Sequence, residues 1–286
     1  MRKNIHSIQT LFFFYVLLAL FACNSPEPSK HDTKPIIEFK YYSKEIKDTF
    51  NISVQLPLEY KEKGSKHYPV VVVTDANFYY PMLAPVMHQY EKAGLLPLLI
   101  LVGIGYKSFK TMDSLRVRDY LYPKSIPSDE MNAIGGGQRF YQFITRNLLP
   151  KIDSNYRTES RTRTLLGHSF GGYFSLYVLL EQLNQNRNDF NGFVSASPSL
   201  WYNNNYLFQL PQKLKTSKDS LNVFLSVGAM ETPEEWTVQP LKNMSKQLKD
   251  AGLKNVKLNT EVYTHLDHMD AGLISFIRGM ELIYEE

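Results

Sequence analysis

The chain has 286 residues, of which 43% are hydrophobic and 21% charged, enough apolar side chain for one large globular domain with a sizeable core. Its formal net charge of +4 excludes the strong charge excess expected of a protein that binds nucleic acid or another highly charged partner. Because Cys23 is the single cysteine, an internal disulfide is also excluded.

The first 22 residues are typical of a bacterial signal peptide. Two basic residues precede an apolar run over residues 11–22, which is shorter than the roughly 20 residues that cross a membrane. Cys23 follows this run directly, and Leu20-Phe21-Ala22-Cys23 resembles a bacterial lipobox. We therefore expect cleavage before Cys23, its acylation, and a protein anchored by lipid in the cell envelope. A free buried cysteine in an ordinary signal peptide is the alternative.

The rest of the chain alternates strand and helix patterns. Residues 23–34 are polar and predict a flexible tether, so a folded domain is expected over 35–286. Strands are predicted at residues 36–42, 49–56, 68–74, 95–104, 162–166, 193–195, 223–227 and 256–263. Helices are predicted at residues 138–149, 172–183, 204–214, 234–251 and 271–284. This alternation indicates an α/β fold with a doubly wound, mostly parallel sheet, helices on both faces, and ligands at the carboxyl ends of the strands.

A Gly-x-Ser-x-Gly motif joins one predicted strand to the next predicted helix. Ser169 lies at its centre, with Gly167 and Gly171 two positions to either side. A strained turn requires such small neighbours, and it would lift the Ser169 hydroxyl above the edge of the sheet. At a strand-to-helix junction this motif is the nucleophile elbow of α/β-hydrolases. The sequence therefore predicts Ser169 as a nucleophile, with a glycine-rich helix cap as the alternative.

A serine nucleophile needs a base and an acid, which follow it in this fold in the order acid, then histidine. Only His265 and His268 lie downstream of Ser169, both just after the last predicted strand; we predict His268 as the base and keep His265 as the alternative. Glu231 follows the strand at 223–227 closely enough to reach the histidine, and it is the predicted acid. The neighbouring carboxylates at 234 and 235 are more typical of charge at a helix start.

The oxyanion hole needs two N–H donors. Phe170 is expected to supply one, and the loop after the strand at 68–74 the other, through Ala76 or Asn77. Asp75 precedes the nucleophile in the chain and is expected to brace this loop. No metal is predicted, because the acidic and histidine side chains of the segment 265–270 have no matching ligand set elsewhere.

Together these residues resemble the esterase D family of serine esterases, which includes enterochelin-esterase-type siderophore hydrolases. The resemblance spans residues 36–284 and rests on the elbow and on four further segments: Val73-Thr74-Asp75-Ala76-Asn77-Phe78, Val102-Gly103-Ile104-Gly105-Tyr106, Arg116-Val117-Arg118-Asp119-Tyr120 and Ser195-Ala196-Ser197-Pro198-Ser199-Leu200-Trp201. It implies an α/β-hydrolase fold and cofactor-free hydrolysis of carboxylic esters. It also implies Ser169 and His268 directly, and Glu231 by position. The sequence departs from the family pattern at Ala76 and Met269, where glycines are usual.

Three further residues are candidate contacts for a small-molecule ester. Arg118 is expected on a loop near the site, with a bracing Arg–Asp pair as the alternative. Trp201 is expected to line the pocket, with a core aromatic as the alternative, and His168 adjoins the nucleophile. Siderophore lactones, acylated sugars, other esters and thioesters are all candidate substrates. A non-catalytic binding lipoprotein and a peptidase on the same fold are the rival functions, and the sequence leaves the oligomeric state open.

Overall fold

The computed structural model describes residues 35–285. The predicted signal peptide, Cys23 and the tether lie outside these residues, so the lipid anchor and the envelope location stay predictions. Within the described part of the chain, no helix combines the length and apolar character that crossing a bilayer requires.

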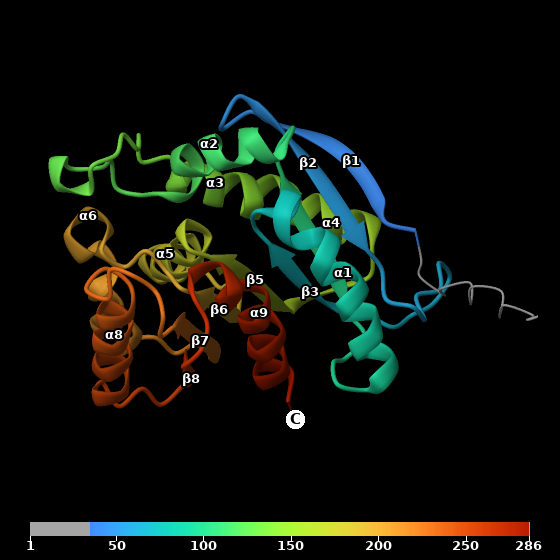
Figure 1. Ribbon diagram of the computed structural model, residues 1–286. Helices are drawn as coiled ribbons and strands as arrows, with labels where there is room; N and C mark the ends of the chain where they lie inside the picture. Colours follow the sequence, from blue (N-terminus) through green and yellow to red (C-terminus); the bar gives the residue numbers. More distant parts are fainter. Residues whose placement is uncertain (1–34, 286) are drawn as a thin grey trace, which may run out of the picture. The chain divides into compact units, whose positions relative to one another are not determined.

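Within residues 35–285, eight strands form a single sheet in the order β1-β2-β4-β3-β5-β6-β7-β8 (Figure 1). The pairs β1–β2 and β2–β4 are antiparallel, and all other neighbours are parallel. The predicted mostly parallel, doubly wound sheet of an α/β-hydrolase is thus confirmed. The strands are β1 (Ile37–Ser43), β2 (Asp48–Gln55), β3 (Tyr68–Val73), β4 (Ile100–Gly105), β5 (Thr158–His168), β6 (Gly192–Ala196), β7 (Leu221–Gly228) and β8 (Val256–Tyr263).

The helices that connect the strands agree with the prediction in the second half of the chain, apart from the helix predicted over residues 204–214, and exceed it in the first half. Neither α1 nor α2 is predicted by the sequence pattern, and the loop expected at Arg116 to Tyr120 is in fact the last part of α2. The helices are α1 (Ala76–Ala93), α2 (Phe109–Tyr120), α3 (Gly137–Phe143), α4 (Leu149–Asn155), α5 (Phe170–Asn184), α6 (Tyr202–Asn205), α7 (Leu210–Leu214), α8 (Val238–Asp250) and α9 (His268–Tyr284).

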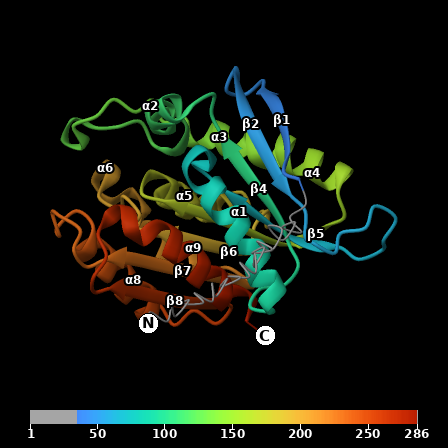
Figure 2. The ribbon, with the colours of Figure 1, turned by 45° about the vertical axis from the view of Figure 1, so that its right-hand side comes forward.

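The sheet is covered on both faces because its central strands are apolar at every position. In β3, Val70 and Val72 pack into one apolar cluster with side chains of α3, α5 and α8. Val71 and Val73 point the other way and pack against α1 and α9. Figure 2 shows α1 and α9 in front of the strands, with α5 behind them.

Four parallel strands end at the edge of the sheet where the predicted site residues lie. Asp75, Ser169, Glu231 and His268 follow the carboxyl ends of β3, β5, β7 and β8 respectively.

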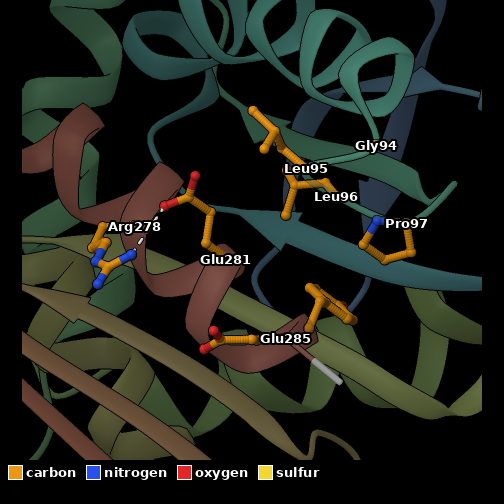
Figure 3. Close-up of a pocket in the computed structure, with 8 residues that line it drawn as sticks. Gly94, Leu95, Leu96, Pro97, Arg278, Glu281 and Glu285 are labelled. Carbon is orange, nitrogen blue, oxygen red and sulfur yellow. Dashed lines mark hydrogen bonds and ion pairs between the residues drawn. The ribbon is translucent and has the colours of Figure 1, made fainter.

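At the far end of α9, a separate pocket of about 560 Å³ is lined by the α1–β4 connection and by the ion pair between Arg278 and Glu281 (Figure 3). Its Glu281 lies 13 residues after His268 in one helix, which places it about 20 Å along the axis from that histidine.

Candidate active site

The turn between β5 and α5 has the geometry predicted for a nucleophile elbow. Ser169 adopts φ 60° and ψ −118°, a conformation that residues other than glycine rarely adopt. A Cβ at Gly167 would overlap the carbonyl oxygen of Gly171, so the close crossing of strand and helix requires glycine there. The Ser169 N–H donates to the carbonyl oxygen of Ala196 at 2.9 Å, which fixes the turn to β6. Ser169 itself is half-buried at this edge of the sheet.

The predicted acid and histidine are hydrogen-bonded to each other. His268 Nδ1 lies 2.8 Å from Oε2 of Glu231, a side chain that is almost fully buried. The other carboxylate oxygen of Glu231 accepts the Ser197 hydroxyl at 2.5 Å and the Gly228 N–H at 2.8 Å. Because a carboxylate only accepts hydrogen bonds, Nδ1 of His268 carries the proton and Nε2 is left as the basic atom. Ser197 is a partner that sequence reasoning missed, since only the fold brings β6 beside β7.

His168 lies between the elbow and the segment that carries His268. Its ring centroid is 4.6 Å from that of His268, and its Nε2 lies 2.7 Å from the His268 carbonyl oxygen. Because a carbonyl oxygen only accepts, a neutral His168 donates this hydrogen bond. The structure does not support the predicted substrate contact of His168, which is only 3% exposed. The residue instead packs against His268 and holds its backbone carbonyl.

His168 predicts a specific dependence of stability on pH. Burial, together with nearby His268 and Arg116, lowers the pKa of the His168 imidazole to about 3. In the unfolded chain an imidazole takes up a proton near pH 6.5, so below that pH the unfolded state binds more protons than the folded state. The free energy of unfolding therefore falls as the pH decreases, by about 2 kcal/mol from this residue between pH 7 and pH 5.

Urea denaturation of the wild type and His168→Gln at both pH values measures this contribution. The variant is expected to lose about 2 kcal/mol less than the wild type over that interval, whatever its stability at pH 7. His265→Gln is the matched control, because His265 is exposed in the turn after β8. The same pH dependence in the wild type and His168→Gln would contradict the assignment of a neutral, buried imidazole.

The predicted oxyanion donors lie at two neighbouring helix N-termini. Phe170 begins α5, and Ala76 and Asn77 begin α1. The first N–H groups of a helix have no acceptor within that helix, and they carry the positive end of its dipole. Because β3 and β5 are adjacent and parallel, both helices present these groups to the same edge of the sheet. An anion at this edge can therefore receive hydrogen bonds from both.

The loop before α1 accommodates an alanine at position 76. The left-handed backbone conformation falls on Asp75, at φ 52°, and not on Ala76. The Ala76 methyl group lies over Gly103, where an added Cβ would approach it to 2.9 Å. The side chain of Asn77 binds both the N–H and the carbonyl of Tyr106, at 2.6 and 2.9 Å. Any contribution of Asn77 to an oxyanion hole is therefore restricted to its backbone.

Arg116 connects the oxyanion loop to the elbow, a role that sequence reasoning missed. Its guanidinium donates to Oδ2 of Asp75 at 2.8 Å and to the carbonyl oxygen of His168 at 3.0 Å. Burial raises the pKa of the Asp75 carboxyl group, and the charge of Arg116 opposes that rise. The sequence signal that could have revealed this role is the spacing of Arg116 and Tyr120, which places both residues on one face of α2. The Tyr120 hydroxyl accepts the Asp75 N–H at 3.1 Å. Asp75 thus braces the loop, as expected.

Arg118 points away from these groups. Its guanidinium binds both carboxylate oxygens of Asp119, at 2.7 and 2.8 Å, and donates to Asp48 of β2 at 2.8 Å. This geometry matches the bracing Arg–Asp pair and leaves the proposed substrate contact of Arg118 without support.

The remaining predicted residues lie around the site. Trp201 is half-buried, with its ring centroid 6.3 Å from that of Phe170. Met269 occupies the position of the usual glycine with its side chain 54% exposed, so it does not crowd the His268 backbone. Among residues 35–285, no group of three or more His, Cys, Asp or Glu side chains is arranged to hold a metal ion.

Comparison with known proteins places this geometry in a family context. A model of the Esterase family, described as "Putative esterase", matches residues 43–270, which include Ser169, Glu231 and His268. The ferri-bacillibactin esterase BesA of Bacillus subtilis is 30% identical over 57% of this chain, and the chain spans 60% of the length of that relative. A siderophore triacetylfusarinine C esterase of Aspergillus fumigatus is 24% identical over 76% of each chain. The solved structure of the BES protein from Bacillus cereus superposes with a TM-score of 0.77 at 25% identity, covering 89% of this chain and 96% of that one.

Proposed function

The chain belongs to the Esterase family, and we propose that this esterase hydrolyses carboxylic esters through a Ser169–His268–Glu231 triad and an acyl-enzyme. The observation that carries the proposal is the hydrogen bond of 2.8 Å between Glu231 and His268. His268 packs against His168, the residue that precedes Ser169, whose backbone is strained. Small-molecule esters are the proposed substrates, and siderophore lactones are a candidate class because the relatives BesA and the triacetylfusarinine C esterase are named for them.

The proposed reaction follows from these positions. The Ser169 hydroxyl attacks the ester carbonyl while His268 Nε2 accepts its proton, and Glu231 stabilises the resulting imidazolium. The N–H groups of Phe170 and of Ala76 or Asn77 stabilise the negative charge on the carbonyl oxygen. His268 then returns the proton to the departing alcohol, and a water molecule releases the acid from Ser169 by the same steps.

Covalent labelling tests this proposal. A fluorophosphonate probe is expected to modify the wild-type protein at the peptide that contains Ser169, and not to modify Ser169→Ala. Ser154→Ala, at an exposed position of α4, is the matched control and should label like the wild type. Equal labelling of all three proteins would show that the probe reacts with a residue other than Ser169. Labelling of none would contradict the assignment of Ser169 and favour a binding protein that retains the fold.

We further propose that Cys23 is acylated and that the domain is held in the cell envelope by this anchor. The lipobox-like sequence before Cys23 supports this proposal. Mass spectrometry of the mature N-terminus would detect a diacyl or triacyl modification of this cysteine, and an unmodified Cys23 would contradict it.

A further inference from the structure

The strand β8 forms one edge of the sheet. Among the described residues it pairs only with β7, and Figure 2 shows it at the margin of the sheet, below that strand. Its pairing with β7 runs from Val256 to Tyr263 without a shift in register, and its sequence contains no proline. A regular edge strand of this kind offers a row of outward N–H and C=O groups to another strand.

The hydrogen bonds to β7 show which residues of β8 have outward backbone groups. The carbonyl oxygens of Asn255 and Tyr263 accept N–H groups at the start of β7 and directly after its end, both at 2.9 Å. Because the backbone groups of successive strand residues point to alternate sides, the odd-numbered residues of β8 face β7. The residues whose N–H and C=O groups point away from the sheet are therefore Val256, Leu258, Thr260 and Val262.

The charged side chains of β8 are complementary to one another when two copies of the strand run antiparallel. With Asn259 on the two-fold axis, Lys257 of each copy lies opposite Glu261 of the other. An axis at Lys257 or at Glu261 would instead place two like charges opposite each other, which is destabilising. Within the described part of the chain, Glu261 forms an ion pair only with Arg278, at 3.9 Å on the surface, where such a pair contributes little.

The same register also satisfies the outward backbone groups. With the axis at residue 259, Val256 lies opposite Val262 of the second copy, and Leu258 lies opposite Thr260. Opposed residues of this type exchange both of their hydrogen bonds, so every outward N–H and C=O group of these four residues gains a partner. Val262, which is 37% exposed, would be covered by Val256 of the second copy. The charged pairs fall at the non-hydrogen-bonded positions, where side chains approach each other more closely.

We propose that β8 is a dimer interface, at which two copies of this chain pair antiparallel about Asn259 and join their sheets into one. A lysine on an edge strand normally discourages pairing, but here each Lys257 meets a carboxylate of the second copy. The partner is a second copy because the charges of the strand itself specify the register. This inference is independent of the proposed esterase activity, since no residue of the triad lies in β8.

Cysteine cross-linking of the full-length chain tests the register. Opposed residues at a non-hydrogen-bonded position have Cα atoms about 4.5 Å apart, within the range that a disulfide spans. Asn259→Cys should therefore form a disulfide-linked dimer under a mild oxidant. Glu261→Cys is the matched control, because two copies of residue 261 are offset by about 14 Å along the strands in this register. The wild type, whose single cysteine is Cys23, measures any cross-linking at that residue.

Charge reversal in the Asn259→Cys background tests the pairing of Lys257 with Glu261. Lys257→Glu and Glu261→Lys each place like charges opposite each other at two symmetric positions, and each should lower the initial rate of cross-linking about five- to tenfold. The two substitutions together restore opposite charges and should restore the rate. Lys40→Glu, at an exposed position of β1 on the other edge of the sheet, is the matched control and should leave the rate unchanged.

The proposal is overturned if Asn259→Cys does not cross-link, or if it cross-links no faster than Glu261→Cys. A doubly reversed variant that does not recover would overturn the pairing of Lys257 with Glu261. Sedimentation velocity of the wild type keeps the test decisive if Asn259→Cys does not fold. A protein that stays monomeric at every concentration overturns the interface, whereas a monomer–dimer equilibrium that Lys257→Glu shifts toward the monomer supports it.

Discussion

Ser169→Ala is expected to lower kcat for ester hydrolysis about 10⁶-fold while leaving the fold intact. The hydroxyl is the atom that forms the acyl-enzyme, and no other group in the site can replace it. The variant should retain a slow reaction, about 10³- to 10⁴-fold above the rate in water, because the N–H groups at the starts of α1 and α5 still stabilise the oxyanion. Steady-state kinetics with an activated aryl ester measures both rates.

Ser169→Gly separates the chemistry from the backbone strain. Glycine adopts φ 60° and ψ −118° without steric cost, whereas alanine is as strained there as serine. We therefore expect Ser169→Gly to be equally inactive but more stable than Ser169→Ala, by about 1–3 kcal/mol in the free energy of unfolding. Activity of Ser169→Ala above one hundredth of the wild-type value would show that another residue is the nucleophile.

The strands were predictable because their apolar runs report burial directly, whereas two helices were hidden by their composition. Pro81 and Pro85 lie inside α1, although proline normally marks the end of a helix. The helix α2 is mostly polar and shows little of the apolar periodicity on which prediction depends. The prediction of a helix starting at 204 was also wrong in part, because residues up to Asn205 form a left-handed turn that is held by the α2–α3 connection.

The candidate site was predictable where chain order restricts the choice of residue. One Gly-x-Ser-x-Gly motif and two downstream histidines left few assignments for Ser169 and His268, and the end of β7 located Glu231. Arg116 and Ser197 belong to the site only through long-range contacts, with partners 41 and 34 positions away in the chain. No local pattern records such pairings, and so the supporting shell becomes visible only in three dimensions.

Glu231→Gln is expected to lower kcat about 10⁴-fold by forcing His268 into the wrong tautomer. The amide of the new side chain has one accepting oxygen and one donating nitrogen. The Gly228 N–H is fixed by the backbone and can only donate, so the amide oxygen must face Gly228 and Ser197, where Oε1 lies in the wild type. The amide nitrogen then faces His268 Nδ1 and donates to it, which moves the imidazole proton to Nε2 and removes the base.

Comparison with Ser197→Ala makes this test specific. That variant removes one of the donors to Glu231 but leaves the carboxylate and the Nδ1 proton of His268 in place, so we expect a loss of about tenfold or less. Thermal unfolding should show that both variants remain folded at the assay temperature, since each keeps the Gly228 N–H paired with a side-chain oxygen. If Glu231→Gln retained more than a tenth of the wild-type kcat, or lost no more than Ser197→Ala, Glu231 would not control the tautomer of His268, and the acid of the triad would have to be sought elsewhere.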